Sequence, residues 1–267
     1  MLVLGFLSAI IMGLILGLIG GGGSILTVPI LVYIMGFGAV QATAYSLFLV
    51  GITSLFGALT SCFKRQVNLR YALFFGLPSV GGVYWARRFL MPNLPDYYFL
   101  NTPFTFSKNE LVLVIFALVM LMASFSMIRS STIVDSTQTV NKEFATFDAF
   151  VVICKGVFVG ILTGFVGAGG GFLIVPFLIF AGGLPMRVAI GTSLLIISVK
   201  SLVGFIGDLN NINEANWPFL LTFSVFSLLG IIAGVNLSDK FSNQRLKLIF
   251  GWFILVMALC ILFTKIF

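Results

Sequence analysis

Long apolar stretches fill this chain, and polar residues are confined to short breaks between them. No charged side chain occurs in residues 1–63, a length that would extend about 95 Å as a helix. The hydrocarbon core of a bilayer is about 30 Å thick, so this stretch must fold back within it. The pattern therefore predicts an all-α polytopic membrane protein. Its apolar stretches fall at 2–19, 25–35, 39–63, 71–91, 111–128, 148–166, 172–181, 186–207, 217–237 and 246–266.

The chain repeats itself at an offset of about 147 residues, which indicates two homologous halves. Residues in register are Gly17 with Gly164, Val28-Pro29 with Val175-Pro176, Ala42 with Ala189, Ser46-Leu47 with Ser193-Leu194, Ser54-Leu55 with Ser201-Leu202 and Gly57 with Gly204. The only markedly polar segment lies between the halves. The predicted division is a first transmembrane repeat at 1–128, a polar linker at 129–147 and a second transmembrane repeat at 148–267.

Equivalent loops of the two halves carry opposite charge. The loop after the third apolar stretch holds Lys64, Arg65 and Arg70, whereas its equivalent around 208–216 holds Asp208 and Glu214 and no basic residue. Because basic loops stay on the cytoplasmic side, this difference favours an inverted repeat. Each half would then contain a glycine-broken segment, a short half-helix and three spanning helices. A parallel arrangement of eight spans is the alternative, and Arg87-Arg88 fits the inverted topology poorly.

Two glycine clusters interrupt the apolar pattern, at Gly20–Gly23 and Gly169–Gly171. Glycine costs a helix about 1 kcal/mol relative to alanine, and a broken helix inside lipid requires surrounding protein or a water-filled cavity. The short helices that follow, expected to kink at Pro29 and Pro176, would begin inside the membrane. Their N-terminal N–H groups attract anions, so an anionic cargo is expected at a shared midplane cavity. The alternative is that these glycines only permit close helix packing.

Hydroxyl groups and one amine complete the predicted site. Ser46, its equivalent Ser193 and neighbouring Thr192 would either line the cavity or bond back to their own helices. An ammonium within an apolar stretch is costly, so Lys200 would contact the anion, pair with Asp208 or snorkel to the surface. The predicted substrate-binding residues are Gly20, Gly21, Gly22, Gly23, Ser24, Ser46, Gly167, Gly169, Gly170, Gly171, Thr192, Ser193 and Lys200.

The amino-acid composition excludes or disfavours several classes of function. The chain is 60% hydrophobic and only 9% charged. These charged residues are too few to cover the surface of a soluble protein of this size, which excludes a soluble enzyme. The net charge of +7 includes no basic run longer than two residues, which favours cytoplasmic loops over nucleic-acid binding. Histidine is absent, and no catalytic residue, metal or cofactor is expected. Cys62, Cys154 and Cys260 are widely spaced and predicted to be buried, so a redox protein or membrane enzyme is the weakest alternative.

The glycine blocks GLIGGGGSILTVPIL at 17–31 and GFVGAGGGFLIVPFL at 164–178 resemble the signature of the TauE/SafE family of membrane permeases. The segments at 67–82 and 216–234 are similar to its later helices. This resemblance covers nearly the whole chain and implies movement of sulfur-containing anions, such as sulfite or sulfonates, through a prokaryotic inner membrane. It also implies that the glycine blocks form the substrate site. The segment 92–109 looks longer than the usual connection.

The expected function is secondary transport of a small anion, a sulfur oxyanion or organosulfonate, by alternating access. A passive anion channel with the same site is one alternative, and a transporter of an unrelated small solute is another. The expected partners are the anion and the lipid bilayer, with a homo-oligomer left open and no nucleic acid.

Overall fold

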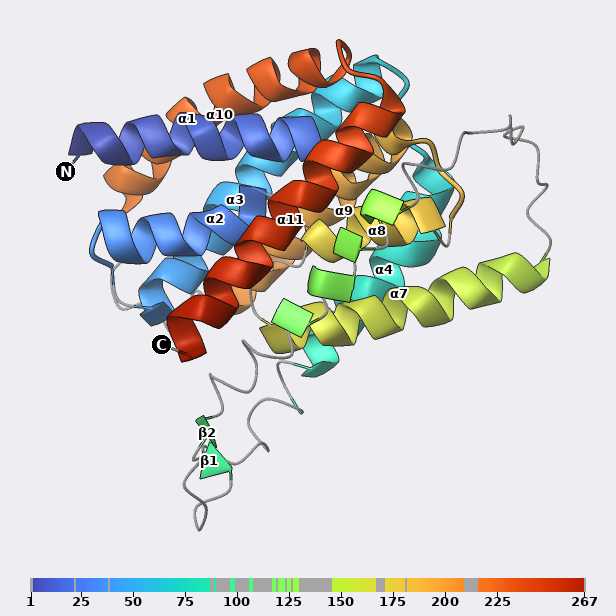
Figure 1. The fold of residues 1–267 in the computed structure, drawn as a ribbon, viewed down its shortest axis with the longest axis horizontal. Helices are drawn as coiled ribbons and strands as arrows, with labels where there is room; N and C mark the ends of the chain where they lie inside the picture. Colours follow the sequence, from blue (N-terminus) through green and yellow to red (C-terminus); the bar gives the residue numbers. More distant parts are fainter. Residues whose placement is uncertain are drawn as a thin grey trace.

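The computed structural model describes residues 2–21, 23–37, 39–86, 89, 97–98, 106–107, 117–118, 120–122, 124–125, 127–129, 146–166, 171–180, 182–208 and 216–266. Helices dominate this part of the chain (Figure 1). In chain order they are α1 (Leu2–Ile19), α2 (Gly23–Pro29), the π-helical turn η1 (Ile30–Ile34), α3 (Ala39–Phe63), α4 (Leu69–Trp85), α7 (Thr146–Val166), α8 (Gly171–Phe180), α9 (Met186–Asp208), α10 (Trp217–Ser238) and α11 (Asn243–Ile266). Within the segment 92–109, strands β1 (Tyr97–Tyr98) and β2 (Phe106–Ser107) pair antiparallel.

Helix length and surface character confirm a helical membrane protein. Among the described residues, four helices are long and apolar enough to cross a bilayer: α3, α9, α10 and α11. Large apolar side chains also point outward, for example Phe63 on α3 and Phe263 on α11, which suits a lipid environment. α1 and α7 are apolar but shorter, and each ends where a glycine cluster begins. The spans around 111–128 lie partly outside the described residues.

Helices that are equivalent in the two predicted repeats pack in equivalent pairs. α1 packs along α10 and α4 along α7, which are equivalent pairs when the halves are exchanged. A Cβ added at Gly13 would lie 2.1 Å from the carbonyl oxygen of Ser227, and one at Gly160 would lie 2.3 Å from that of Ser79. These two contacts join counterparts of the two repeats. The small side chains let each helix pair approach to backbone contact, as small residues four positions apart do in membranes.

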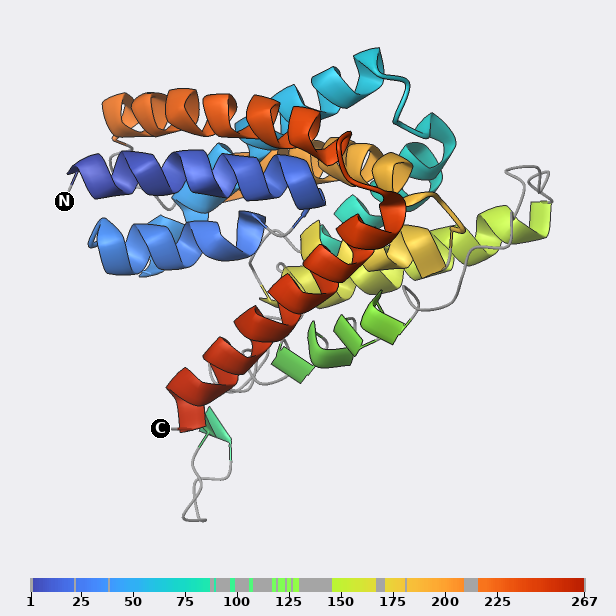
Figure 2. The same ribbon diagram turned by 45° about the horizontal axis from the view of Figure 1, so that its top comes forward.

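Helix directions follow from the same contacts. Along α1 and α10, Gly13 lies against Ser227 and Gly17 against Ile231, so the two helices are parallel. Figures 1 and 2 show these two helices side by side. The equivalent helices α3 and α9 run in opposite directions, because Gly51 meets Leu202 whereas Gly57 meets Leu194. The antiparallel pair α3 and α9 lies between the other two helix pairs and contacts α10 and α4.

Charged and polar side chains connect the helices at one end of this bundle. The Lys64 ammonium lies 2.6 Å from an Asp239 carboxylate oxygen, and the Gln66 amide donates to the other oxygen at 2.9 Å. Arg187 donates to the backbone carbonyl oxygens of Asp239 and Phe241 at 2.9 and 2.8 Å. These contacts join the α3–α4 loop of the first repeat to α9 and α10 of the second. We call this the basic end, defined by Lys64, Arg65, Arg70, Arg187 and Lys240.

The pKa of Asp239 reflects this environment. Burial alone would raise the pKa of its carboxyl group, but the hydrogen bonds from Lys64 and Gln66 lower it more. The charges of Lys64 and Arg187 act in the same direction. The pKa therefore lies below the ordinary aspartate value, and the carboxylate stays ionised at neutral pH.

Aromatic rings close the opposite end of the bundle. The Tyr45 hydroxyl accepts hydrogen bonds from the Asn216 backbone N–H and the Gln41 side-chain amide, each at 2.8 Å. The ring of Phe37 lies 5.2 Å from that of Tyr45 and 4.9 Å from that of Phe219. Here too, residues of both repeats meet, because α3 and α10 both begin at this end.

Candidate functional site

The first glycine cluster separates α1 from α2. Gly20 has φ +83°, a left-handed conformation that favours glycine, and its N–H donates to the Leu16 carbonyl oxygen at 2.8 Å. α1 therefore ends at Ile19, and α2 begins at Gly23. A side chain at Gly20 would also collide with α9, since its Cβ would lie 2.8 Å from the Ile190 Cα. Backbone conformation and close packing both require glycine there.

The prolines of the two short helices have different effects. Pro29 ends α2, and the chain continues as the π-helical turn η1, in which Met35 N–H donates to the Ile30 carbonyl oxygen at 3.1 Å. Proline has no N–H, so it interrupts the regular α-helical ladder at this point. Pro176 is buried inside α8, which remains α-helical as far as Phe180. The expected kink takes the form of a π-turn in the first repeat.

The start of α8 lies next to the glycine break between α1 and α2. α7 ends at Val166 and α8 begins at Gly171. A Cβ added at Gly171 would lie 3.1 Å from the Gly21 Cα and 2.5 Å from the Ile197 Cδ1 on α9. The start of α8 is therefore in contact with the break that follows α1. Four predicted site residues, Gly22, Gly167, Gly169 and Gly170, lie outside the described residues, so the shared cavity they would line stays a prediction.

Two buried serine hydroxyl groups form hydrogen bonds at the glycine break between α1 and α2. The Ser193 hydroxyl on α9 lies within hydrogen-bond distance of the carbonyl oxygens of Gly20, at 2.9 Å, and Ile190, at 2.8 Å. The Ser24 hydroxyl donates to the Gly21 carbonyl oxygen at 2.7 Å. Both serines are almost fully buried. These bonds satisfy carbonyl oxygens of the break, and one of them links the first repeat to the second.

Lys200 is buried against the last turn of α7. Its side chain is only 4% exposed, so the snorkelling alternative is wrong. The ammonium donates to the hydroxyl oxygen of Thr163 on α7, and that hydroxyl donates in turn to the Gly160 carbonyl oxygen at 3.1 Å. Thr163 lies in the last turn of α7, immediately before the glycine cluster. The interaction fixes the buried Lys200 side chain against the last turn of α7, and its assignment to the substrate site stays a prediction.

The sequence did not single out Thr163, and no repeat signal could have done so. Its counterpart in the first half is Leu16, and the counterpart of Lys200 is Thr53. Thr53 shares a hydrogen bond with the Ser227 hydroxyl at 2.7 Å. The lysine–threonine pair therefore exists in one repeat only, and the site is chemically asymmetric.

Thr192 and Ser46 are also buried, with Thr192 in a structural contact. The Thr192 hydroxyl accepts a hydrogen bond from the Asn68 backbone N–H at 2.9 Å, which anchors the α3–α4 loop. Its counterpart Tyr45 accepts from Asn216 in the same way. Ser46 lies on α3 with almost no exposed surface. The assignment of both residues to the substrate site stays a prediction.

The cysteine prediction was wrong. Cys62, Cys154 and Cys260 are all exposed rather than buried. They lie on outward faces of α3, α7 and α11, where a small apolar thiol suits lipid as well as it suits a core. Among the residues that the structure describes, no group of three or more His, Cys, Asp or Glu side chains could hold a metal ion.

Comparison with known proteins identifies the family. The family described as "Sulfite exporter TauE/SafE" matches residues 4–261. A "Probable membrane transporter protein" of Xylella fastidiosa (strain 9a5c) is 30% identical over 266 residues, covering 96% of this chain and 92% of the relative. The "Probable membrane transporter protein MJ0441" of Methanocaldococcus jannaschii is 26% identical over 270 residues, covering 95% of this chain and 94% of the relative. No solved structure gives a significant match. This chain belongs to the TauE/SafE family of membrane transporters.

Proposed function

We propose that this transporter moves a small anion, a sulfur oxyanion or an organosulfonate, by alternating access at the paired glycine breaks. The observation that carries the proposal is the contact between the start of α8 and the break that follows α1, with Lys200 buried against the last turn of α7. Gly171 lies against Gly21, and Lys200 bonds to the end of α7. The match to a family described as sulfite exporters supports the choice of cargo.

The electrostatics of the breaks favour a negative cargo. Two helices begin there, α8 with ten residues and α2, whose seven residues continue into η1. A helix N-terminus stabilises an anion by up to about 2 kcal/mol in partly buried geometries. Ser24 and Ser193 occupy carbonyl oxygens of the first break, which reduces the negative potential near the cargo. Together with the Lys200 ammonium, these features make the proposed site electropositive.

The proposed topology is an inverted repeat, with the basic end in the cytoplasm. Support comes from α3 and α9, which are equivalent in sequence yet run in opposite directions. Repeats related by an axis along the membrane normal would make equivalent spanning helices parallel, whereas an axis in the membrane plane makes them antiparallel. The basic residues gathered around Lys64 and Arg187 favour the cytoplasm for that end.

Alternating access requires a closure on each side of the site. The bundle has two candidate closures, and each joins residues of both repeats. The ion pair of Lys64 with Asp239 closes the basic end, and the Tyr45 contacts with Asn216 and Phe219 close the other. Rocking of one repeat against the other would break one set of contacts at a time. A passive channel would need neither closure.

Ligand-induced stabilisation tests the cargo. Purified protein is heated with sulfite, thiosulfate, sulfoacetate, taurine or sulfate at matched ionic strength, and the unfolding midpoint is recorded for each. A ligand at 100 times its Kd stabilises the folded state by about 2.7 kcal/mol. At least one sulfur anion should raise the midpoint at submillimolar concentration, whereas chloride should not. Equal responses to every salt would refute a specific anion site.

A further inference from the structure

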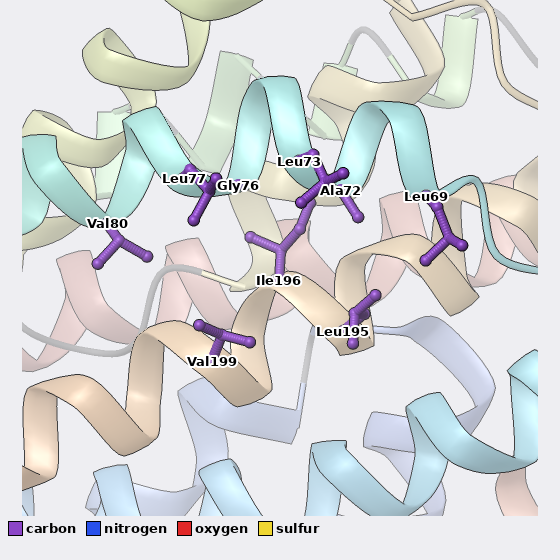
Figure 3. A pocket seen from close by; sticks show the side chains of 9 residues that line it. All are labelled: Leu69, Ala72, Leu73, Gly76, Leu77, Val80, Leu195, Ile196 and Val199. Atoms are coloured by element: carbon purple, nitrogen blue, oxygen red, sulfur yellow. The ribbon is translucent and has the colours of Figure 1, made fainter.

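An apolar groove lies on the outer surface of the protein between α4 and α9 (Figure 3). It has a volume of about 300 Å³. Its walls include Leu69, Leu73 and Leu77 of α4 and Ile196 and Val199 of α9. Leu69 and Leu77 remain 62% and 61% exposed, so the groove opens outward. The described residues that line it include none of the glycine breaks, so the groove is separate from the proposed anion site.

The counterpart of this groove in the other repeat is filled with aromatic rings. Trp217 occupies the position equivalent to Leu69, and Phe48 occupies the position equivalent to Leu195. The rings of Phe48 and Trp217 pack edge to face with centroids 5.7 Å apart, and Phe205 packs against the same tryptophan at 6.3 Å. Between α4 and α9, leucines stand at the positions equivalent to Trp217 and Phe48. Among the described residues, large rings thus pack between α3 and α10 where smaller side chains line the groove between α4 and α9.

An arginine lies on the same face of α4 as three of the residues that line the groove. Arg70, Leu73, Leu77 and Val80 are spaced by three, four and three residues, which places them on one face of the helix. Arg70 is exposed, and within the described part of the chain it forms no hydrogen bond or ion pair. Its counterpart in the filled repeat is Pro218. Arg70 directly follows Leu69, which lines the groove, whereas the equivalent position in the other repeat has no charge.

The length of the groove matches one leaflet of a bilayer. Leu69 and Val80 are eleven residues apart, or about 16 Å along a helix. Half of the hydrocarbon core is about 15 Å. The arginine end lies at the basic end of the bundle, so the groove runs from the membrane surface toward the midplane.

We propose that this groove is a binding site for an anionic phospholipid, with an acyl chain against Leu73 and Leu77 and the phosphate at Arg70. The charge of Arg70 distinguishes this occupant from a zwitterionic lipid, whose phosphate is offset by its own cation. The outer faces of the leucines contact bilayer lipid in any case, and the groove holds one chain in a fixed place beside the arginine.

The test measures phosphatidylglycerol binding to delipidated full-length protein in detergent. Native mass spectrometry counts bound lipid, and the unfolding midpoint is titrated with phosphatidylglycerol, phosphatidylcholine of the same acyl chains, or glycerol 3-phosphate. The variants are Arg70→Gln and Leu73→Trp. Their matched controls are Arg245→Gln, an exposed arginine near the start of α11, and Leu221→Trp, the repeat counterpart of Leu73.

The proposal predicts tighter binding of phosphatidylglycerol than of phosphatidylcholine. Arg70→Gln should weaken phosphatidylglycerol binding about fivefold and erase the preference, since one basic residue near the surface contributes about 1 kcal/mol. Leu73→Trp should prevent binding of both lipids, and the controls should behave like the wild type. Unchanged lipid binding in Arg70→Gln would overturn the proposal. Equal stabilisation by glycerol 3-phosphate, or a lipid-free dimer that Leu73→Trp separates, would also overturn it.

Discussion

At the residue scale, the contact between Lys200 and Thr163 explains how an ammonium is accommodated in an apolar helix. An unpaired charge at this depth costs several kcal/mol, and the threonine hydroxyl accepts one of its hydrogen bonds. The same hydroxyl is held by the Gly160 carbonyl oxygen, which fixes its orientation. Thr163 is therefore a positioning residue for Lys200 in the proposed site.

Substitution of this pair should weaken anion binding in a graded way. We expect Lys200→Met to raise the Kd for the transported anion at least tenfold, because a hydrogen bond to a charged group contributes about 1.5–3 kcal/mol. Thr163→Val should have a smaller effect in the same direction, and Thr163→Ser should restore binding. Calorimetric titration measures all three variants. Wild-type affinity in Lys200→Met would show that the amine has no contact with cargo.

Asp239 makes the stability of the basic end depend on pH. Its pKa is lower in the folded protein than in the unfolded chain, so ionisation stabilises the fold. This contribution is complete above the ordinary aspartate pKa of about 3.9 and is lost as the pH falls through the lower folded value. We expect Asp239→Asn to reduce the unfolding midpoint at pH 7 and to converge with the wild type in acid. Parallel pH profiles of the two proteins would contradict this role.

At the element scale, glycines determine which helices pair. A Cβ at Gly230 would lie 2.1 Å from the Ile10 carbonyl oxygen, so α1 and α10 could not approach as closely with alanine there. Gly82 has the same relation to Val157 across α4 and α7, at 2.5 Å. The two interfaces are therefore built by the same contacts in both halves of the protein.

Gly230→Ala should destabilise the protein by about 1–3 kcal/mol, the usual cost of overpacking. Gly81→Ala is the matched control, since Gly81 is also in a helix and has nothing within 4 Å of its added Cβ. Thermal unfolding in detergent should give a lower midpoint for the first variant and no decrease for the second. A similar midpoint for both would show that the interface can relax around a methyl group.

The sequence predicted some of these elements and missed others for identifiable reasons. The separate helices α1 and α2 were predictable because consecutive glycines cannot continue a helix. Gly13 with Gly17, and Gly230 with Gly234, have the four-residue spacing that is typical of close helix packing in membranes. Such a motif does not indicate which helix it packs against, so the pairing of α1 with α10 could not be predicted from the sequence. The Thr163 contact was equally hidden, because it depends on the approach of two helices from one repeat.

At the scale of the whole molecule, the antiparallel relation of α3 and α9 sets the proposed topology. If the repeats are inverted, the end of α3 and the end of α9 face opposite compartments. In a background without cysteine, single cysteines at Arg65 and Asp208 should react with a membrane-impermeant maleimide from opposite sides of oriented vesicles. Labelling of both positions from one side would refute the inverted repeat.

Anion flux through the glycine breaks is the most direct test of the central claim. Leucine at position 171 would place its side chain between α8, Ile197 and the Gly21 backbone, whereas leucine at position 81 would extend into open space. In proteoliposomes, we predict that Gly171→Leu abolishes uptake of radiolabelled sulfite or thiosulfate and that Gly81→Leu retains it, with both variants folded and monodisperse. Normal uptake by folded Gly171→Leu would contradict a cargo path through the breaks.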